Sequence, residues 1–587
     1  MQRRKFLRTV GTVAPGALAA PLVHAASPGK HNIKNLSKQK EPRVFFFDDG
    51  RHAADLYCFE PPVTPEDHTF IVDQLANSGV DALVYFASVE GGSALYDSKA
   101  VQVWGDEVKK WKHYVWYRAG RILRQLIDDG HDPLKLFCDR CHETGILMIA
   151  SGWVSLHGGP RERLEGLGRS TAFTMDNPQF QVGDDPDPKA KGNKYSESGA
   201  MLTSRFSFLH KEVRQERLRL FEEMLTDYET DGIELNLTDA MPYCKFSEAD
   251  ELAPIMTQWL RDLRAIANKA EEKQGRKKRI YARIPAHPDA WNLVGYEVSI
   301  WISENLVDGF FCESSHSEDE GLVQDFDCKP VVNLAKGSKC NVYSILHNVL
   351  GRQFARYATP PMIYAGVANA YDQGVDGIAM GDHLWTPNGW PWTPQEYDTL
   401  RLLGHPELLA TADKYYMVRS PKRNGWPSQD PSKMWLPGRS EVLPIELEEG
   451  ETIKVSFAVA DTVEKWRSLG RLKAVVLRVR FANIISTVDK VKIEFNNQVL
   501  PDSLLQKVDF TYRLVGQEST SHSIGPYGYA YDFHLSPKYG PKHGRNEVKV
   551  TVLKRDRNIE GDLSLVNVDC KISYRLHRHF EDRPIEY

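Results

Sequence analysis

The sequence has little net charge and, beyond its first residues, no long hydrophobic run. Its 74 Lys and Arg residues nearly balance 79 Asp and Glu residues, giving a formal net charge of −5 over 587 residues. This balance provides no overall basic footprint for nucleic acid. No run after the N-terminal segment reaches the length of a membrane-spanning helix. We therefore expect no nucleic acid and no membrane span, and the sequence leaves the oligomeric state open.

Several motifs of hydrolases and nucleotide-binding proteins are also absent. The sequence has no Gly-x-Ser-x-Gly motif, and no Ser or Cys has a convincing His partner, which argues against a nucleophilic triad. No Gly-rich phosphate loop follows the first predicted strand, which argues against a doubly wound nucleotide-binding sheet. No ligand spacing is diagnostic for zinc or calcium. We expect no metal and no cofactor.

Eight cysteines make an even count, which permits disulfides in an exported protein without giving their connectivity. The segment Cys138-Asp139-Arg140-Cys141-His142 has the spacing of a haem c attachment motif. Haem attachment needs an unfolded chain after export, whereas the export signal described next carries folded proteins. We expect mostly free, buried thiols, with Cys138 and Cys141 packed beneath a helix.

The first residues resemble an export signal. Arg3-Arg4 with Lys5 and Arg8 forms a twin-arginine pattern, and the mildly apolar residues 9–23 follow. Small residues near Ala25 suit a cleavage site, so residues 1–26 are predicted to be a twin-arginine signal peptide. The alternative is a basic N-terminal tail. The predicted location is periplasmic or extracellular.

Short apolar runs alternate with helical patterns over residues 43–418, which predicts an α/β fold with a (β/α)₈ TIM barrel. The predicted strands are residues 44–47, 82–86, 146–150, 233–237, 280–284, 309–312, 341–346 and 377–380. Two long insertions, residues 90–117 and 155–206, follow the second and third strands. Insertions at that place lie on the face where barrels bind substrates.

The pattern changes to strict alternation after the barrel. Leu477, Val479 and Phe481 alternate with Arg478 and Arg480, as in a strand with one buried face. Repeated runs of this kind predict a C-terminal all-β sandwich over residues 440–580. Residues 419–439, rich in Pro, Ser and Gly, are the predicted linker.

The most informative segment is the fourth predicted strand. Ile233 and Leu235 alternate with Glu234 and Asn236, so the two polar side chains share the face opposite the aliphatic ones. Carboxylates near the carboxyl ends of barrel strands are placed to act on substrate. Glu234 is the candidate catalytic acid/base. The alternative is a structural carboxylate paired with Arg283 on the next strand.

Glycoside hydrolysis needs two carboxyl groups across the scissile bond. Glu313 and Asp382 follow the sixth and eighth predicted strands and are the candidate partners of Glu234. Alternatively, Glu313 is a loop carboxylate, and Asp382 caps a helix or orients His383. Asp48 and Asp49 precede a Gly turn, so one is expected to form the turn and the other to hold sugar hydroxyls.

The predicted substrate-binding residues are polar or aromatic and lie at or after strand ends. They suit sugars because aromatic faces stack on pyranose rings and a guanidinium matches sulfate or carboxylate groups. The predicted set comprises Asp48, Asp49, Trp153, His157, Asn236, Arg283, His316, His383, Trp385 and Trp390.

A series of short segments, spread over residues 43–580, occurs in a recognisable order. They are Asp48-Asp49-Gly50, Gly79-Val80-Asp81-Ala82-Leu83, Gly130-His131-Asp132-Pro133, residues 228–237, Arg283-Ile284-Pro285, Trp301-Ile302, Leu306-Val307-Asp308, Ala335-Lys336-Gly337, Gly374-Val375-Asp376-Gly377-Ile378 and Asn546-Glu547-Val548. In this order the chain resembles the exported glycoside-hydrolase-like TIM-barrel proteins of planctomycete-type bacteria.

The resemblance implies a glycosidase that acts on a polysaccharide or oligosaccharide. The chain departs from the family pattern at Asn236, where the family has Asp, and at Asp239, where it has Arg. It also has Ser151-Gly152-Trp153 where the family has Arg and an Asn-Asp pair, with His157 a candidate for a retained residue. These departures leave a second hypothesis open, a non-catalytic carbohydrate-binding protein on a degenerate barrel.

Overall fold

The protein is represented by a computed structural model. It describes residues 41–50, 56, 59–185, 204–238, 241–314, 322–348, 350, 358–381, 394–418, 443–509 and 528–576. The predicted signal peptide and the predicted linker lie outside the described residues, so both stay predictions.

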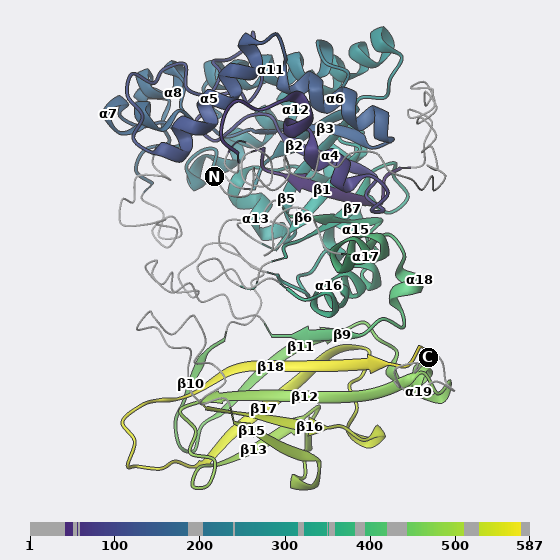
Figure 1. The fold of residues 1–587 in the computed structure, drawn as a ribbon. Coiled ribbons are helices and arrows are strands. Elements are labelled where there is room, and N and C mark those ends of the chain that lie inside the picture. The colour runs from purple at the N-terminus through teal and green to yellow at the C-terminus, as the bar shows by residue number, and fades with distance from the viewer. Residues whose placement is uncertain are drawn as a thin grey trace, which may run out of the picture.

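The N-terminal part is a closed barrel of eight parallel strands in chain order, which confirms the predicted fold class (Figure 1). The strands are β1 (Val44–Asp48), β2 (Ala82–Phe86), β3 (Leu147–Trp153), β4 (Gly232–Asn236), β5 (Arg279–Pro285), β6 (Gly309–Glu313), β7 (Asn341–Leu346) and β8 (Gly377–Met380). Each lies within a few residues of its predicted range, because a buried parallel strand is a short apolar run.

Helices surround the barrel. They are α3 (Pro65–His68), α4 (Phe70–Leu75), α5 (Tyr114–Asp128), α6 (Pro133–Thr144), α7 (Arg161–Leu164), α8 (Ala172–Asp176), α11 (Lys211–Thr226), α12 (Ala249–Gln274), α13 (Pro288–Val294), α14 (Val298–Ser303), α15 (Lys329–Ala335), α16 (Pro360–Asp372), α17 (Pro394–Leu403) and α18 (Pro406–Leu409). Among the described residues, no helix combines the length and the apolar character needed to cross a membrane.

The alternation along β4 divides its side chains between two cores. Ile233, Leu235 and Leu237 belong to the large apolar cluster between barrel and helices. Glu234 and Asn236 take the opposite, inward side, because successive side chains of a strand point to opposite faces. A charged side chain at this place is enclosed by the barrel itself, which is costly unless it has partners.

Aromatic rings fill the lower part of the barrel interior. The ring of Phe45 lies 5.3 Å from Tyr281, 4.8 Å from Phe311 and 4.7 Å from Tyr343 between centroids, each in an edge-to-face arrangement. Such pairs add favourable geometry to the burial of large apolar rings. The ring layer forms a floor below Glu234, so the polar groups above it face the carboxyl ends of the strands.

Four aspartates repeat one contact at the opposite end of the barrel. Each precedes an even-numbered strand and accepts the backbone N–H of the first or second residue of the strand before it. The pairs are Asp81 with Val44 (2.9 Å), Asp231 with Met148 (2.9 Å), Asp308 with Ile280 (2.9 Å) and Asp376 with Val342 (2.8 Å). A carboxylate that accepts a backbone N–H makes a strong, charge-assisted hydrogen bond. These bonds fix the start of every odd-numbered strand.

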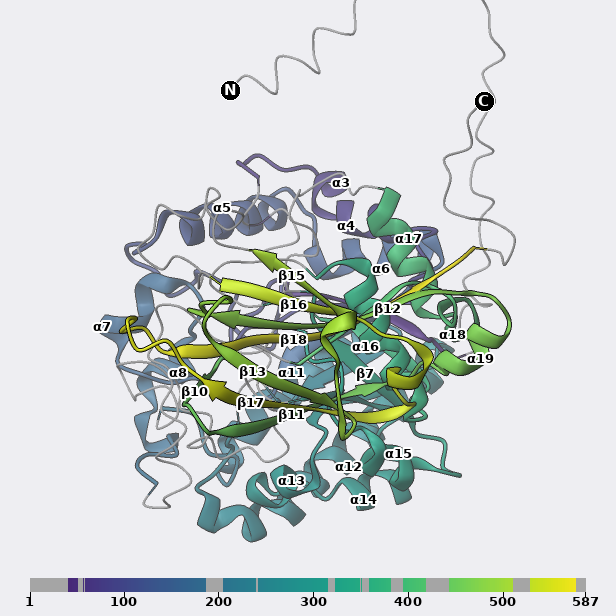
Figure 2. The ribbon, with the colours of Figure 1, turned by 90° about the horizontal axis from the view of Figure 1, so that it is seen from below.

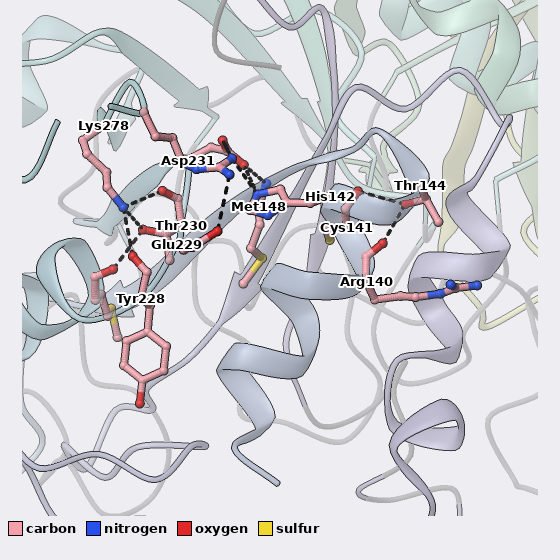
Figure 3. A network of polar contacts seen from close by, with 12 residues as sticks. Arg140, Cys141, His142, Thr144, Met148, Tyr228, Glu229, Thr230, Asp231 and Lys278 are labelled. Atoms are coloured by element: carbon pink, nitrogen blue, oxygen red, sulfur yellow. Dashed lines mark hydrogen bonds and ion pairs between the residues drawn. The ribbon is translucent and has the colours of Figure 1, made fainter. Parts of the chain in front are cut away.

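Asp231 carries the largest of these networks (Figure 3). Besides the Met148 N–H, it lies 2.9 Å from His142 Nε2 and accepts from Arg276 Nη1 at 2.8 Å. Asp231 and Arg276 are both buried. Next to them, Lys278 Nζ donates to the carbonyl of Thr230 at 2.7 Å. The cluster connects α6, β3, β4 and β5 through buried polar groups that satisfy one another.

The C-terminal part consists of two antiparallel sheets, seen from below in Figure 2. Their strands are β9 (Lys414–Met417), β10 (Ile445–Leu447), β11 (Thr452–Val459), β12 (Leu472–Ala482), β13 (Lys490–Phe495), β14 (Gln498–Val499), β15 (Leu505–Asp509), β16 (Gly528–His534), β17 (Gly544–Lys554) and β18 (Leu563–Tyr574), with α19 (Val463–Ser468) between β11 and β12. One sheet has the order β10-β18-β12-β16-β15 with β9 beside β18, and the other β11-β17-β13-β14.

Gln324 joins the barrel to the sheet that contains β9. Its side-chain amide donates to the carbonyls of Met362 in α16 and Tyr415 in β9, both at 2.8 Å. Its side-chain oxygen accepts the N–H of Met417 at 2.8 Å. Asn369 in α16 adds a contact at 3.2 Å to the carbonyl of Ala458 in β11. Side-chain amides therefore satisfy backbone groups of strands at this junction.

The described cysteines agree with the expectation of free thiols. Seven of them are free and buried, including Cys138 and Cys141 on α6. Burial raises the pKa of both thiols, which keeps them protonated and unreactive at neutral pH. His142, the third member of the haem-like motif, is engaged with Asp231. The motif is therefore part of the structural network at the barrel's lower end.

We expect Asp569 to make the stability of the sandwich depend on pH. It is buried in β18 and accepts the Tyr415 hydroxyl at 2.7 Å. Burial raises its pKa from 3.8 to about 6, against the Tyr415 hydrogen bond and the charge of Arg478, which lower it. The folded state thus holds this proton more tightly than the unfolded state. The resulting contribution is fully present below about pH 3.8 and is lost as pH rises through about 6.

A change of about two pKa units corresponds to about 3 kcal/mol. We expect the stability of Asp569→Asn relative to wild type to improve by about 2–3 kcal/mol between pH 4 and pH 7.5, because the amide cannot ionise. Urea unfolding of both proteins at the two pH values measures this difference. An equal difference at both values would contradict the assignment.

Candidate active site

Glu234 is the middle residue of β4 and is fully buried. Ser151 is its register neighbour on β3, and the Ser151 hydroxyl donates a short hydrogen bond to Glu234 Oε2. Arg283 Nε on β5 donates to Glu234 Oε1 at 2.9 Å. The structure therefore contains the Glu234–Arg283 pair that the sequence suggested as the structural alternative. It also places Glu234 on the inward side that a catalytic role requires.

Arg283 is held between aromatic rings. Its guanidinium carbon lies 4.4 Å from the ring centroid of Phe47 and 5.2 Å from that of Phe86, and the side chain is buried. A planar guanidinium stacks favourably on aromatic faces. Its Nη1 lies 3.8 Å from Glu313 Oε1. One fixed cation thus stands between Glu234 and Glu313.

Glu313 ends β6 and is also buried. Its Oε2 accepts the hydroxyl of Thr238 at 2.6 Å, and its Oε1 lies 3.4 Å from His347 Nε2. Thr238 follows β4 and His347 follows β7, so three strand ends meet around this carboxyl group. The contact of Glu313 with Arg283 joins it to Glu234 in one cluster.

The place of His347 depends on a glycine at the end of β8. A Cβ atom at position 381 would lie 2.3 Å from His347 Nδ1 and 2.7 Å from Cε1. Only glycine leaves room for the imidazole ring against this strand end. The ring is thereby confined beside Glu313.

Burial raises the pKa of Glu234 above its ordinary value of 4.5. The charge of Arg283 and the hydrogen bond from Ser151 act in the opposite direction, and the charge of Glu313 adds to the rise. A carboxylic acid with a raised pKa keeps its proton at a pH where an ordinary glutamate has lost it. This is the property that a general acid needs near neutral pH.

Two carboxyl groups on either side of one cation can share acid and base chemistry. One that keeps its proton can donate it to a leaving oxygen, and one that is ionised can attack or activate water. Arg283 is near both, so it can stabilise whichever carboxylate is charged at each stage.

The other described residues of the predicted site divide between turn and wall positions. Asp48 Oδ1 accepts the N–H of Gly50 at 2.9 Å, so this side chain forms the turn after β1, and Asp49 beside it is buried. Trp153 belongs to the apolar cluster inside the barrel. Asn236, also buried, has its Oδ1 3.4 Å from the Thr238 hydroxyl. Asn236 therefore lies next to the Glu313 cluster.

His157 is a neutral imidazole beside Trp153. The two rings are 5.6 Å apart in an edge-to-face arrangement, and the backbone N–H of His157 donates to the carbonyl of Glu90 at 2.7 Å. Burial, together with the charge of Arg205, lowers the pKa of His157 from 6.5 to about 3. His157 therefore carries no charge at neutral pH and can contribute only neutral hydrogen bonds.

Five predicted site residues lie outside the described residues: Asp382, His316, His383, Trp385 and Trp390. Their assignments stay predictions. Among the described residues, no group of three His, Cys, Asp or Glu side chains is arranged to hold a metal ion.

Sequence reasoning missed the residues that surround the two carboxyl groups. Thr238 and His347 directly follow β4 and β7, and their polar character at a strand end was a usable signal. Ser151 lies within a strand, and Phe47 and Phe86 are apolar residues of the kind that fill any barrel. Their contacts with Glu234 and Arg283 depend on register across neighbouring strands, which the sequence does not display.

No family model matches the sequence, and no curated protein matches it. Solved structures with a similar fold include a cycloisomaltooligosaccharide glucanotransferase of a Paenibacillus species, 10% identical with a TM-score of 0.33 over 90% of this chain and 57% of that one. A second is the alpha-L-fucosidase isoenzyme 2 of Paenibacillus thiaminolyticus, 13% identical with a TM-score of 0.37 over 62% and 48%.

A third is a glycoside hydrolase family 18 N-acetylglucosaminidase of Paenibacillus barengoltzii, 12% identical with a TM-score of 0.32 over 61% of this chain and 99% of that one. The chain spans about half the length of the first two. All three are carbohydrate-processing enzymes by description, but likeness at this level carries no argument about the reaction of this chain. The function is therefore argued from the site.

Proposed function

We propose that the protein is a glycoside hydrolase that acts on a polysaccharide or oligosaccharide, with Glu234 as the acid/base and Glu313 as its partner. The supporting observation is the position of the two carboxyl groups on either side of Arg283, with Glu234 in the middle of β4 and Glu313 at the carboxyl end of β6. Carbohydrate is the substrate class that a pair of carboxyl groups at a barrel mouth suits best.

In the proposed reaction, protonated Glu234 donates its proton to the glycosidic oxygen as the bond to the sugar breaks. Glu313 carries the negative charge that attacks the sugar or takes a proton from water. Arg283 stabilises that carboxylate and then the carboxylate left on Glu234. Thr238 and His347 hold Glu313 in one orientation, so the reacting oxygen keeps its position.

The second candidate is a carbohydrate-binding protein without catalysis. It is favoured by the completeness of the bonds to Glu234, which accepts from both Ser151 and Arg283 as a structural carboxylate would. Asn236 in place of the family's Asp favours it as well. Under this proposal the barrel retains a sugar site and lacks a working acid.

A screen of the purified protein on polysaccharides separates the two candidates. We expect new reducing ends from at least one substrate, and we expect Glu234→Gln to abolish them while it still binds that substrate. Binding of a glycan without product by the wild-type protein would instead support the second candidate. A product with an unsaturated chromophore would overturn both and indicate a lyase.

A further inference from the structure

An alternating row of rings and guanidinium groups runs along one face of α5. Tyr114, Tyr117, Arg118 and Arg121, which we call the α5 stripe, are spaced three or four residues apart and therefore share a helix face. The guanidinium carbon of Arg118 lies 5.3 Å from the centroid of the Tyr114 ring, and that of Arg121 lies 5.8 Å from the Tyr117 ring. Each arginine thus covers one tyrosine.

The α5 stripe is on the outer face of its helix. The opposite face packs Ala119, Ile122, Leu123 and Leu126 into a separate apolar cluster. Tyr114 is 66% exposed and Tyr117 is 44% exposed, which places them among the most exposed large apolar side chains of the described residues. The fold of α5 is secured by its buried face, so it does not require rings at these two positions.

The sequence around the stripe is rich in cations. Residues 108–124 contain six Lys or Arg residues and no Asp or Glu, in a chain whose formal net charge is −5. Lys109, Lys110 and Arg121 are exposed. Arg118 is paired with Glu60 at 3.0 Å, and Glu60 is itself largely exposed. The surface is therefore locally cationic and aromatic at once.

The start of α5 packs on the insertion that follows the carboxyl end of β3. Lys112 Nζ donates to the carbonyl of Arg163 in α7 at 3.0 Å. Arg169 lies with its guanidinium carbon 5.0 Å from the Trp116 ring and forms an ion pair with Glu90 at 2.6 Å. In both overall views α5 lies on the same side of the barrel as α7 and α8 (Figures 1 and 2).

Glu90 links this surface to the candidate site. Its carbonyl accepts the N–H of His157, whose ring contacts Trp153 in the barrel wall. A continuous set of contacts therefore runs from the barrel interior through Glu90 and Arg169 to the start of α5. This set of contacts ties the start of α5, next to the α5 stripe, to the wall of the barrel.

We propose that the α5 stripe binds a segment of an anionic polysaccharide, one bearing sulfate or carboxylate groups, outside the catalytic centre. Tyr114 and Tyr117 stack on sugar rings, and the exposed Arg121 pairs with an anionic group beside them. This inference rests on the proposed glycan-directed function and specifies the class of glycan.

A glycan fits the stripe better than other polyanions. The repeat of ring and guanidinium matches a chain in which each sugar ring carries a charged substituent. The net charge of the whole protein opposes nucleic acid, whose binding depends on phosphate neutralisation. The exposed rings are tyrosines with polar hydroxyl groups, and the apolar face of the helix is buried against the protein, so it is not available to insert into a membrane surface.

The test measures binding of dextran sulfate and of neutral dextran of matched length by affinity electrophoresis of the full chain. Tyr114→Ala with Tyr117→Ala removes both rings and keeps every charge. Arg121→Gln removes one exposed cation. The matched control is Lys269→Gln with Lys273→Gln on α12, which Figure 2 shows on the other side of the barrel. Circular dichroism and thermal unfolding verify that each variant is folded.

We expect dextran sulfate to bind more tightly than dextran by at least tenfold. We expect the double tyrosine variant and Arg121→Gln each to weaken dextran sulfate binding at least fivefold, and the α12 control to change it less than twofold. Unchanged binding by the tyrosine variant would overturn the proposal. It would also be overturned if a DNA duplex or anionic vesicles bound as tightly and lost affinity equally in the variants.

Failure of this proposal can be told apart from failure of the proposed function. The binding assay needs no turnover and is repeated with Glu313→Gln, whose stripe is intact. If the wild-type protein hydrolyses a neutral glycan but does not bind dextran sulfate, only the proposed role of the α5 stripe is overturned. If the wild-type protein binds dextran sulfate through the α5 stripe but hydrolyses no glycan, the proposed hydrolase function is overturned and the stripe is supported as a glycan-binding surface.

Discussion

Glu234→Gln lowers kcat/KM on a natural glycan by about 10²–10⁴-fold, the contribution expected of a positioned general acid. The amide is nearly isosteric and still accepts hydrogen bonds from Ser151 or Arg283, so the change removes the proton donor and little else. The loss is expected to be much smaller on an aryl glycoside whose leaving group departs without protonation. Steady-state kinetics on both substrates measure the contrast.

The pH profile provides an independent readout. Because burial raises the pKa of Glu234, the protonated acid persists above the ordinary range of a glutamate. Wild-type kcat/KM is therefore expected to fall on the alkaline side as pH passes this raised pKa, and Glu234→Gln is expected to lose that limb. A variant with wild-type rate and an unchanged alkaline limb would show that Glu234 is not the acid.

Asp231→Ala destabilises the barrel by about 3–5 kcal/mol, the range for removing one partner of a buried ion pair. Arg276 is left as a buried cation, and the Met148 N–H loses its acceptor. Burial raises the pKa of Asp231, but the hydrogen bond from His142 and the charge of Arg276 outweigh it and lower the pKa overall. Its stabilising effect is therefore present above pH 3.8 and is lost as pH falls below that value.

The comparison is made by urea unfolding at pH 7 with Glu229→Ala as the matched control. Glu229 lies 3.5 Å from the same Arg276, but its side chain is 65% exposed. An exposed pair of this kind contributes about 0–1 kcal/mol. Asp231→Asn retains an acceptor and is expected to fall between the two. Equal effects of Asp231→Ala and Glu229→Ala would contradict the role assigned to the buried network.

The barrel could be predicted because each strand can be recognised from its own residues. Each strand is a short apolar run, and the alternation in β4 assigns Glu234 to the interior without reference to any other segment. The same alternation identified the sandwich strands, where Leu477, Val479 and Phe481 are buried. Strand ends were less certain: β3 extends to Trp153, three residues beyond its prediction, because Gly152 and Trp153 interrupt the apolar run.

The site was predicted only in part, since it is assembled across strands. Glu234 and Arg283 were linked because they lie on consecutive strands, and Glu313 because it ends a strand. The orientation of Glu313 by Thr238 and His347 depends on loops after β4 and β7 that meet only in the closed barrel. The space that Gly381 leaves for His347 is likewise a property of packing and not of either residue alone.

The segments that suggested a family resemblance have a structural explanation as well. Those containing Asp81, Asp231, Asp308 and Asp376 supply the carboxylates that bind the starts of the odd-numbered strands. These four aspartates lie at the amino ends of the strands. Part of the resemblance is therefore explained by residues that hold the barrel closed. The residues around Glu313 are the ones to test for the chemistry of this chain.

The four aspartates divide the barrel into four strand pairs: β1 with β2, β3 with β4, β5 with β6 and β7 with β8. Each pair contains one hydrogen bond between an aspartate and a strand backbone. Each of these hydrogen bonds joins two strands that are consecutive in the chain, so every strand pair contains the groups that set its own alignment. Exchanges of sequence made between strand pairs keep all four hydrogen bonds. Exchanges made within a pair separate an aspartate from the strand that it binds. The connections before β3, β5 and β7 are accordingly the best places to recombine this barrel with others.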